Sequence, residues 1–255
     1  MGIMKPTLTI VFLLASVFCA LADPPCVSTP CSANIKKIED CPDEGCTRSQ
    51  GHEFDQELDK RKNIRSDDQT AIMQSVQWIK DLNKPTNLTE CGSRDELKQL
   101  GEGQKITVVA WALTAKKGSG ESCNCDLTSQ RNTDNHIVLV DPGVKNPTLA
   151  KDERHSVTAE FTPRTRLDHA NFTRIKLNRL IDRNWKATQR NANGKLLVRV
   201  TGLVLFDSKH FFHPQPPVIR DTNWEIHPVL KMEYCPKGKT CRADSDENWK
   251  DLDNG

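Results

Sequence analysis

The stretch ESCNCDLTSQRNTDNHIVLV, residues 121 to 140, combines side chains that could bind a metal ion with the start of an apolar run. Its polar part contains Glu121 and Asn124, and it ends in Asp134 and His136. Carboxylate and imidazole groups are ligands for zinc and similar divalent ions. Because side chains two residues apart in a strand point to the same face, Asp134 and His136 could approach one ion together.

A second group of polar side chains lies nearer the end of the chain. Asp207, His210 and His213 follow one apolar run, and Glu225 and His227 belong to the next. The alternation of a strand puts Glu225 and His227 on one face. The opposite face, which we expect to point into the core, carries Trp224, Ile226, Leu230 and Met232. The metal hypothesis takes its ligands from Asp134, His136, His210 and His227.

Three interpretations of these groups compete. In the first, Cys123 and Cys125 form disulfides with other cysteines, such as Cys91 or Cys235, and the histidines are structural. In the second, the groups bind zinc or another divalent metal, although no HExxH spacing fixes the geometry. In the third, the loops contact a ligand without a metal, through Glu121, Asn124 and Asp207.

A bound metal would also permit an enzyme. It could lower the pKa of a water molecule for hydrolysis of a phosphodiester or a similar ester. Glu160 or Glu225 would then be the general base, and Arg164 could stabilise developing negative charge. The chain has no Gly-x-Ser-x-Gly elbow, phosphate loop or dinucleotide fingerprint. We therefore favour non-catalytic binding over a metal-dependent hydrolase.

Residues 1–22 have the pattern of a signal peptide. A short basic start precedes the apolar run LTIVFLLASVFCALA, and Ala20-Leu21-Ala22 predicts cleavage before Asp23. The run is short for a spanning helix, so we expect a secreted or periplasmic protein with no membrane association after cleavage. Without residues 1–22 the chain has 35 basic and 34 acidic residues, and its charge indicates no partner.

Nine cysteines remain after this cleavage, and an exported protein forms disulfides by default. Because nine is odd, at least one thiol must be free, metal-bound or paired between chains. A direct bridge between Cys123 and Cys125 would close a strained ring. Residues 23–66 carry four cysteines in the pattern C-x4-C-x9-C-x4-C, which favours disulfides over a zinc ribbon. This polar segment cannot bury a core of its own.

The rest of the chain predicts a mainly β fold. Residues 67–103 form a helical lead-in, with one helix capped by Ser66 and Gln69 and another over SRDELKQL. Residues 104–235 then give the order β-β-β-α-β-β, in which the strands are 104–116, 136–141, 155–162, 195–207 and 223–234. Five strands with a helix between the third and fourth predict an OB-fold-like Greek-key barrel, and a β-sandwich explains that helix less well.

Breaker residues add detail to this barrel. Gly202 predicts a bulge or bend in the fourth strand, and Pro228 puts the fifth strand at an edge or a bulge. Residues 236–255 read as a polar C-terminal tail. In an OB-fold, ligands bind beside the loop after the first strand and the loop after the fourth. The sequence therefore predicts a ligand site between residues 117–136 and 207–227.

A nucleic acid is not favoured as the ligand. Between Arg164 and Arg199 there are ten lysines and arginines against Asp168 and Asp182, and such a stripe could follow phosphates. However, the chain as a whole is near neutral, and it has few aromatic residues on which bases could stack. The identity of the ligand stays open.

Four motifs resemble those of a family of exported bacterial proteins with no assigned activity. They are CPDEGC, ESCNC followed by NHI, VRVTGLVLFDSKH, and WEIHPV. The resemblance extends from about Cys41 to Cys235 and implies that these motifs form one unit. It carries over no catalytic residue.

Overall fold

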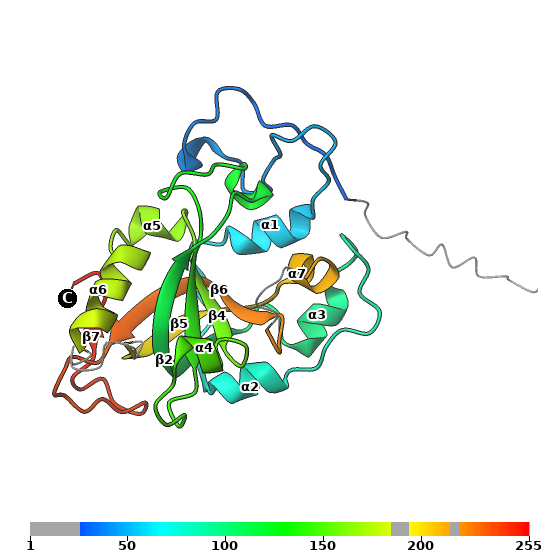
Figure 1. The fold of residues 1–255 in the computed structure, drawn as a ribbon. Helices are drawn as coiled ribbons and strands as arrows, with labels where there is room; N and C mark the ends of the chain where they lie inside the picture. The colour runs from blue at the N-terminus through cyan, green and yellow to red at the C-terminus, as the bar shows by residue number, and fades with distance from the viewer. Residues whose placement is uncertain (1–25, 185–193, 215–219, 255) are drawn as a thin grey trace, which may run out of the picture.

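The computed structural model describes residues 26–184, 194–214 and 220–254 (Figure 1). The expected signal peptide, residues 1–22, lies outside these ranges. Within them, no helix combines the length and the apolar character needed to cross a bilayer.

Five strands form a closed barrel. They are β2 (Lys105–Lys117), β3 (Asn135–Val140), β4 (Val157–Phe161), β5 (Leu196–Phe206) and β6 (Trp224–Tyr234). Their order around the barrel is β2-β3-β4-β6-β5, and β5 pairs again with β2. Neighbours are antiparallel except β4 and β6, which are parallel. With α6 (Arg174–Asn184) between β4 and β5, this is the predicted OB-fold-like barrel.

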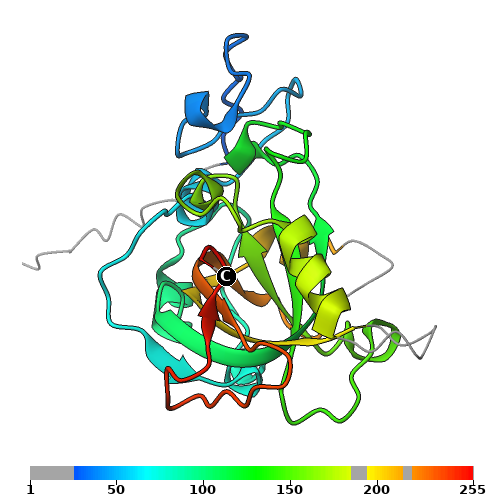
Figure 2. The same ribbon diagram turned by 90° about the vertical axis from the view of Figure 1, so that its left-hand side faces the viewer.

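The alternation of apolar side chains explains where the core lies. On β2, Ile106, Val108, Ala110 and Ala112 are fully buried and point into the barrel. Helix α6 packs against β2 and adds Leu177 to the same core (Figure 2). Three short helices from the barrel connections lie around it: α4 (Leu149–Asp152), α5 (Thr165–Asp168) and α7 (Ser208–Phe212).

A bulge interrupts the pairing of β5 with β6, as expected from Gly202. The pairing register shifts on both sides of Gly202, and a Cβ atom there would lie 2.4 Å from the Pro228 carbonyl oxygen. Pro228 is therefore at a bulge and not at an edge, since β6 lies between β4 and β5. The bulge also changes the alternation of β6: Val229 enters the core, whereas Leu230, expected there, is only partly buried.

The lead-in before the barrel is less helical than predicted. Residues Ile72–Gln74 form β1, which pairs in parallel with β2. Helix α2 (Val76–Asp81) begins only after Ser75, whose side chain accepts a hydrogen bond from the first turn. The predicted helix start at Ser66 is thus wrong. Ile72–Gln74, which would have belonged to that helix, pair with β2 instead. The second expected helix is present as α3 (Asp95–Leu100).

Disulfides attach the cysteine-rich segment to the rest of the molecule. This segment forms η1 (Ile38–Asp40) and α1 (Gln56–Lys62). Within it, α1 lies nearest the barrel, and the part around η1 lies farther out (Figure 1). Cys26–Cys91 and Cys41–Cys125 link the segment to the rest of the molecule, and Cys31–Cys46 is a bridge within it. Its four cysteines are therefore not zinc ligands. Such bridges fit a compartment outside the reducing cytosol.

The C-terminal residues are tied to the barrel. Cys235 and Cys241 form a fourth disulfide, and β7 (Lys250–Asp251) pairs with β6. Leu252 is fully buried in the barrel core. Residues 236–255 are mostly polar, but the side chain of Leu252 packs into the barrel core and anchors them there.

Candidate functional site

Polar side chains of β4 and β6 lie together on the outer face of the barrel wall. Ala159 and Ile226 pair with each other and point into the core. Their strand neighbours Glu160, Glu225 and His227 consequently point outward. Outward-facing side chains are usually exposed, yet none of these three is more than 4% exposed. A second layer must therefore cover this part of the barrel.

That layer consists of α1 and the loop between β2 and β3. The loop contains η2 (Ser122–Asn124), and α1 packs against both η2 and β6. Figure 1 shows α1 and this loop at the same end of the barrel as the cysteine-rich segment. The polar groups are thus enclosed between the barrel wall and a disulfide-bonded cover.

Glu160 connects two histidines in this enclosed layer. One carboxylate oxygen lies 3.3 Å from His136 Nε2, and the other lies 3.3 Å from His227 Nδ1. His227 Nδ1 also lies 3.2 Å from Glu225 Oε1, with which it forms a hydrogen bond. Residues from β3, β4 and β6 therefore converge on one point.

Asp134, Glu160 and His227 form a group that could hold a metal ion. Each offers one ligand atom, and these atoms all lie within 4.8 Å of one another. Asp134 Oδ1, Glu160 Oε2 and His227 Nε2 have no hydrogen-bond partner among the residues that the structure describes. Buried polar atoms almost always have a partner, so these three atoms fit a cation that would satisfy them. Of the four ligands that the sequence proposed, Asp134 and His227 belong to this group and His136 and His210 do not, and the fold adds Glu160.

The electrostatics of the group favour a positive charge in its centre. Burial and repulsion from Glu225 and Asp134 raise the pKa of Glu160 well above its usual range. Burial and Glu121 raise the pKa of Asp134, and burial lowers the pKa of His136. Bound protons or a bound cation would relieve this repulsion. Metal binding here should therefore compete with protons.

Lys62 supplies a buried positive charge beside the metal group. Its Nζ lies 2.7 Å from Glu121 Oε2, and the two side chains are 4% and 7% exposed. Burial alone would lower the pKa of Lys62, but the attraction of Glu121 outweighs it and raises this pKa well above its usual range. Burial would likewise raise the pKa of Glu121, but Lys62 and Lys209 lower it to about 2. Both groups are therefore charged at neutral pH.

Two other groups of side chains are less suited to a metal. Glu121, Cys123 and Asp134 also come within 4.8 Å of one another, but Lys62 already compensates Glu121. Burial, followed by the nearby carboxylates, raises the pKa of the free Cys123 thiol well above its usual range, so it is a poor ligand. The sulfur atoms of Cys31, Cys46 and Cys125 are close together only because they belong to two disulfides.

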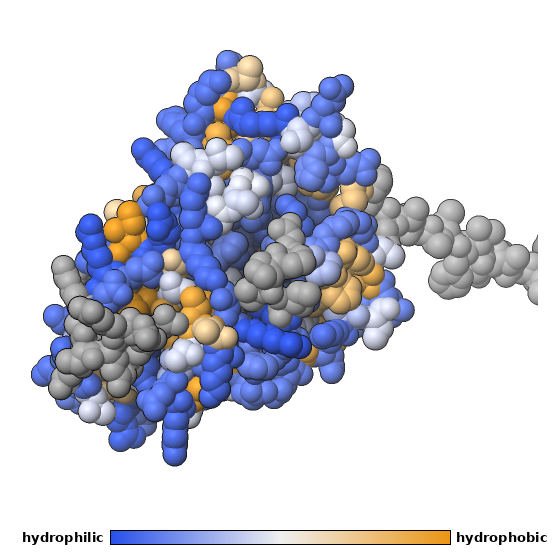
Figure 3. Space-filling view, in the orientation of Figure 1, coloured by the Kyte–Doolittle hydropathy of each residue, from blue (hydrophilic) through white to orange (hydrophobic). Residues whose placement is uncertain are grey.

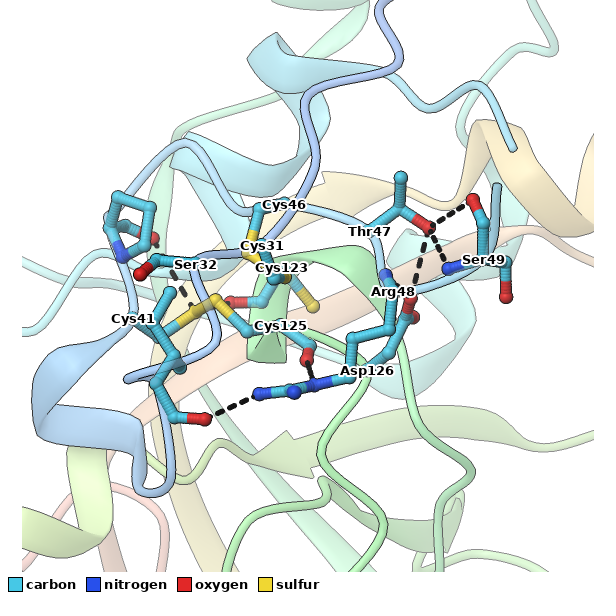
Figure 4. Close-up of a disulfide and its surroundings, with 12 residues drawn as sticks. Cys31, Ser32, Cys41, Cys46, Thr47, Arg48, Ser49, Cys123, Cys125 and Asp126 are labelled. Carbon is cyan, nitrogen blue, oxygen red and sulfur yellow. Dashed lines mark hydrogen bonds between the residues drawn. A yellow bond between two sulfur atoms is a disulfide. The ribbon is translucent and has the colours of Figure 1, made fainter. Parts of the chain in front are cut away.

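The cysteine-rich segment fixes the cover in place (Figure 4). Cys125 pairs with Cys41 rather than with Cys91 or Cys235. Arg48 Nε donates a hydrogen bond of 2.8 Å to the Cys125 carbonyl oxygen. The disulfide and this hydrogen bond hold the end of η2 against the segment.

A hollow of about 340 Å³ opens beside the metal group. Its lining includes Lys84, Lys116, His136, Glu153, His210 and Arg220. The side chain of His136 is 31% exposed, so it connects the enclosed layer with the hollow. His136 and His210 come from the two loop regions that the barrel topology predicts to meet. The face of the molecule drawn in Figure 3 is mostly hydrophilic.

Other residues that the sequence singled out lie away from the hollow or make internal contacts. His213 Nε2 lies 2.6 Å from Glu90, and Arg164 donates to the carbonyl oxygens of Cys41 and Pro42. Asn124 is 1% exposed and donates to Asp134 Oδ2 at 2.9 Å. Its contact with a ligand, like those of Glu121 and Asp207, stays a prediction.

Asp207 caps α7 and pairs with His210 Nδ1. Burial would raise the pKa of Asp207, but the hydrogen bond from His210 and the charge of Lys62 lower it below its usual range. The same hydrogen bond raises the pKa of His210. The stabilisation from Asp207 is therefore lost as the pH falls below about 3.8, and that from His210 is lost as the pH rises above about 6.5.

This pair predicts a pH-dependent effect of one substitution. H210Q should lower the melting temperature most between about pH 4 and pH 6.5, where both partners are charged, and clearly less at about pH 9. Thermal melts of the variant and the parent at about pH 5.5 and pH 9 measure the difference. H213Q, at a histidine whose side chain is 61% exposed, is the control. A loss for H210Q that is equal at both pH values would contradict a charged pair.

No protein-family model matches this chain, and no curated protein is similar to it in sequence. The fold alone names no activity, so function must be argued from the site. The motifs ESCNC, NHI, FDSKH and WEIHPV all contribute residues to the enclosed layer or to the hollow beside it. Their membership of one family stays a prediction.

Proposed function

We propose that this chain is an exported OB-fold protein that binds one divalent metal ion through Asp134, Glu160 and His227. The supporting observation is that each of these residues offers a ligand atom within 4.8 Å of the others and also carries a buried atom without a hydrogen-bond partner among the described residues. Asp134 directly precedes β3, Glu160 lies on β4 and His227 lies on β6. Without a cation, these three atoms would lose their hydration and gain no hydrogen bond with a described residue in exchange.

The chemistry of the ligands favours zinc. Imidazole nitrogen and carboxylate oxygen are common zinc ligands, and three protein ligands leave a fourth position open. His227 donates from Nδ1 to Glu225, which leaves Nε2 for the ion. A carboxylate that orients the imidazole in this way is typical of metal-binding histidines. Glu160 lies beside His136, which lines the hollow.

The first test is metal binding by the oxidised protein. After treatment with a chelator and dialysis against zinc, we expect one zinc ion per chain by elemental analysis. At a free zinc concentration 100 times the Kd, binding should stabilise the fold by about 2.7 kcal/mol. E160Q and H227Q should weaken binding at least 100-fold, on the order of the loss expected for such sites. H155Q, at an exposed histidine that contacts Asp221, is the matched control.

E160Q separates a metal site from a structural cluster. Glutamine resembles the protonated carboxyl group, which burial and the neighbouring carboxylates favour at this position, so at about pH 8 the metal-free variant should melt at or above the temperature of the metal-free parent. The same variant should no longer be stabilised by zinc. If E160Q melts lower than the parent without metal, the carboxylate is structural. If the parent binds no zinc, manganese or iron, the proposed function is wrong.

A metal-dependent hydrolase is the second candidate, and His136 is the observation that favours it. Its Nε2 lies 3.3 Å from Glu160 Oε1 but forms no hydrogen bond with a described residue, and burial lowers its pKa, so the neutral ring can accept a proton. His136 thus replaces Glu160 as the candidate base, because Glu160 would bind the metal. Arg164 contacts the cysteine-rich segment, and Arg220 is the arginine at the hollow.

Hydrolysis can be tested with the zinc-loaded protein and nitrophenyl phosphate esters. If the protein is an enzyme, H136Q should lower kcat at least 100-fold, the lower limit for loss of a general base, while the bound zinc is kept. An inactive parent protein that retains one zinc ion per chain would leave metal binding as the function.

A further inference from the structure

The hollow beside the metal group has a positively charged lining. Among the described residues its charged side chains are Lys84, Lys116, Arg220, His210 and a single carboxylate, Glu153. Glu153 pairs with Lys116 and compensates its charge. The remaining positive side chains have no carboxylate opposite them within the lining.

Arg220 forms no direct hydrogen bond with a residue that the structure describes. Its guanidinium lies 3.9 Å from Asp207 and 4.0 Å from Glu225, beyond hydrogen-bond distance, and its side chain is 20% exposed. Lys84 makes no ion pair with any residue that the structure describes. His210 uses Nδ1 for Asp207, which leaves Nε2 for another contact. Donors on three side chains are therefore available in one hollow.

We infer that this hollow binds the phosphate group of a small phosphate monoester, next to the metal ion. This inference rests on the proposed function. Three terminal oxygens and two negative charges match the guanidinium of Arg220, the imidazole of His210 and the ammonium of Lys84 better than a carboxylate does. A volume of about 340 Å³ is in the range of small-molecule sites.

The inference makes metal and anion binding interdependent. Glu160 and Glu225 lie behind His136 and Arg220, so without a metal these two acidic side chains add no positive charge for an anion. A divalent ion would add positive charge at this position. Phosphate monoester should therefore bind well only to the metal-loaded protein, and by reciprocity it should tighten metal binding.

The experiment is calorimetric titration of phenyl phosphate into the full oxidised protein. The protein is loaded with zinc and freed of excess metal by gel filtration, or treated with a chelator. We expect binding to be at least tenfold weaker without zinc. R220Q should weaken binding at least tenfold, and R220K should recover part of the loss. R242Q, at an exposed arginine that pairs with Asp244, should bind like the parent. Phenylacetate should bind at least tenfold more weakly than phenyl phosphate.

Elemental analysis of every variant separates the two hypotheses. If zinc binds and phenyl phosphate does not, the inference is wrong and the proposed function stands. If zinc does not bind, both are wrong. Equal binding of phenyl phosphate with and without zinc would contradict the coupling. Equal binding of phenylacetate, or an R220Q variant that keeps its zinc and binds like the parent, would overturn the assignment of the hollow to phosphate.

Discussion

Replacing Lys62 by methionine should destabilise the oxidised protein by about 3–5 kcal/mol. The ammonium is the nearest cation to Glu121, at 2.7 Å, and both side chains are almost fully buried. Methionine fills a similar volume but leaves the carboxylate charged and without its partner. Urea unfolding of the metal-free protein at about pH 7 measures the loss.

A double-mutant cycle shows whether the loss comes from this pair. E121Q removes the charge that K62M leaves unpaired, so the double variant should be more stable than K62M alone. K98M is the matched control, since Lys98 forms an exposed pair with Asp95 and should change stability by less than about 1 kcal/mol. Additive effects of K62M and E121Q would show that the two charges do not depend on each other.

Local sequence patterns were sufficient to predict the barrel. Each strand contains a run of apolar residues that ends at a turn, and the positions of β2 to β6 follow these runs closely. Gly202 also carried a clear signal, because a strand with a glycine in its interior usually bends there. The order of the elements then left the OB-fold as the arrangement that accommodates the single helix α6.

Pairing between distant segments was not visible in the sequence. Ile72–Gln74 continue a helical spacing, yet they form β1 because the edge of β2 is available to pair with them. Leu230 follows the regular alternation of a strand, but the bulge opposite Gly202 turns it away from the core. Disulfide partners depend equally on the fold, and spacing alone could not select Cys41 for Cys125.

The candidate site was predictable to the extent that it follows from strand alternation. Asp134 directly precedes β3 and His136 is its second residue, and Glu225 and His227 share a face of β6, so topology could bring these groups together. Lys62 could not be found in this way, because it belongs to a polar helix whose position depends on disulfides. Arg220 gave no signal either, since a loop residue acquires its place only from the folded barrel.

The largest combined effect on fold and site is expected from removing the Cys41–Cys125 disulfide. The two cysteines are 84 residues apart, and closing a loop of this length corresponds to about 4.5 kcal/mol of stabilisation in the chain-entropy model. The bridge also joins the cover to the cysteine-rich segment, next to η2. The double variant C41S/C125S should therefore lose about this stability and also bind zinc at least tenfold more weakly, because Asn124 and Asp134 would no longer be held in place.

The Cys235–Cys241 disulfide provides the matched control. Its cysteines are only 6 residues apart, so its removal corresponds to about 2.4 kcal/mol in the same model, and it lies outside the cover. C235S/C241S should consequently be destabilised less and should keep the zinc affinity of the parent. Urea unfolding and zinc titration of both double variants give the two quantities separately. A C41S/C125S variant that is less stable but binds zinc like the parent would show that the cover does not position the metal ligands.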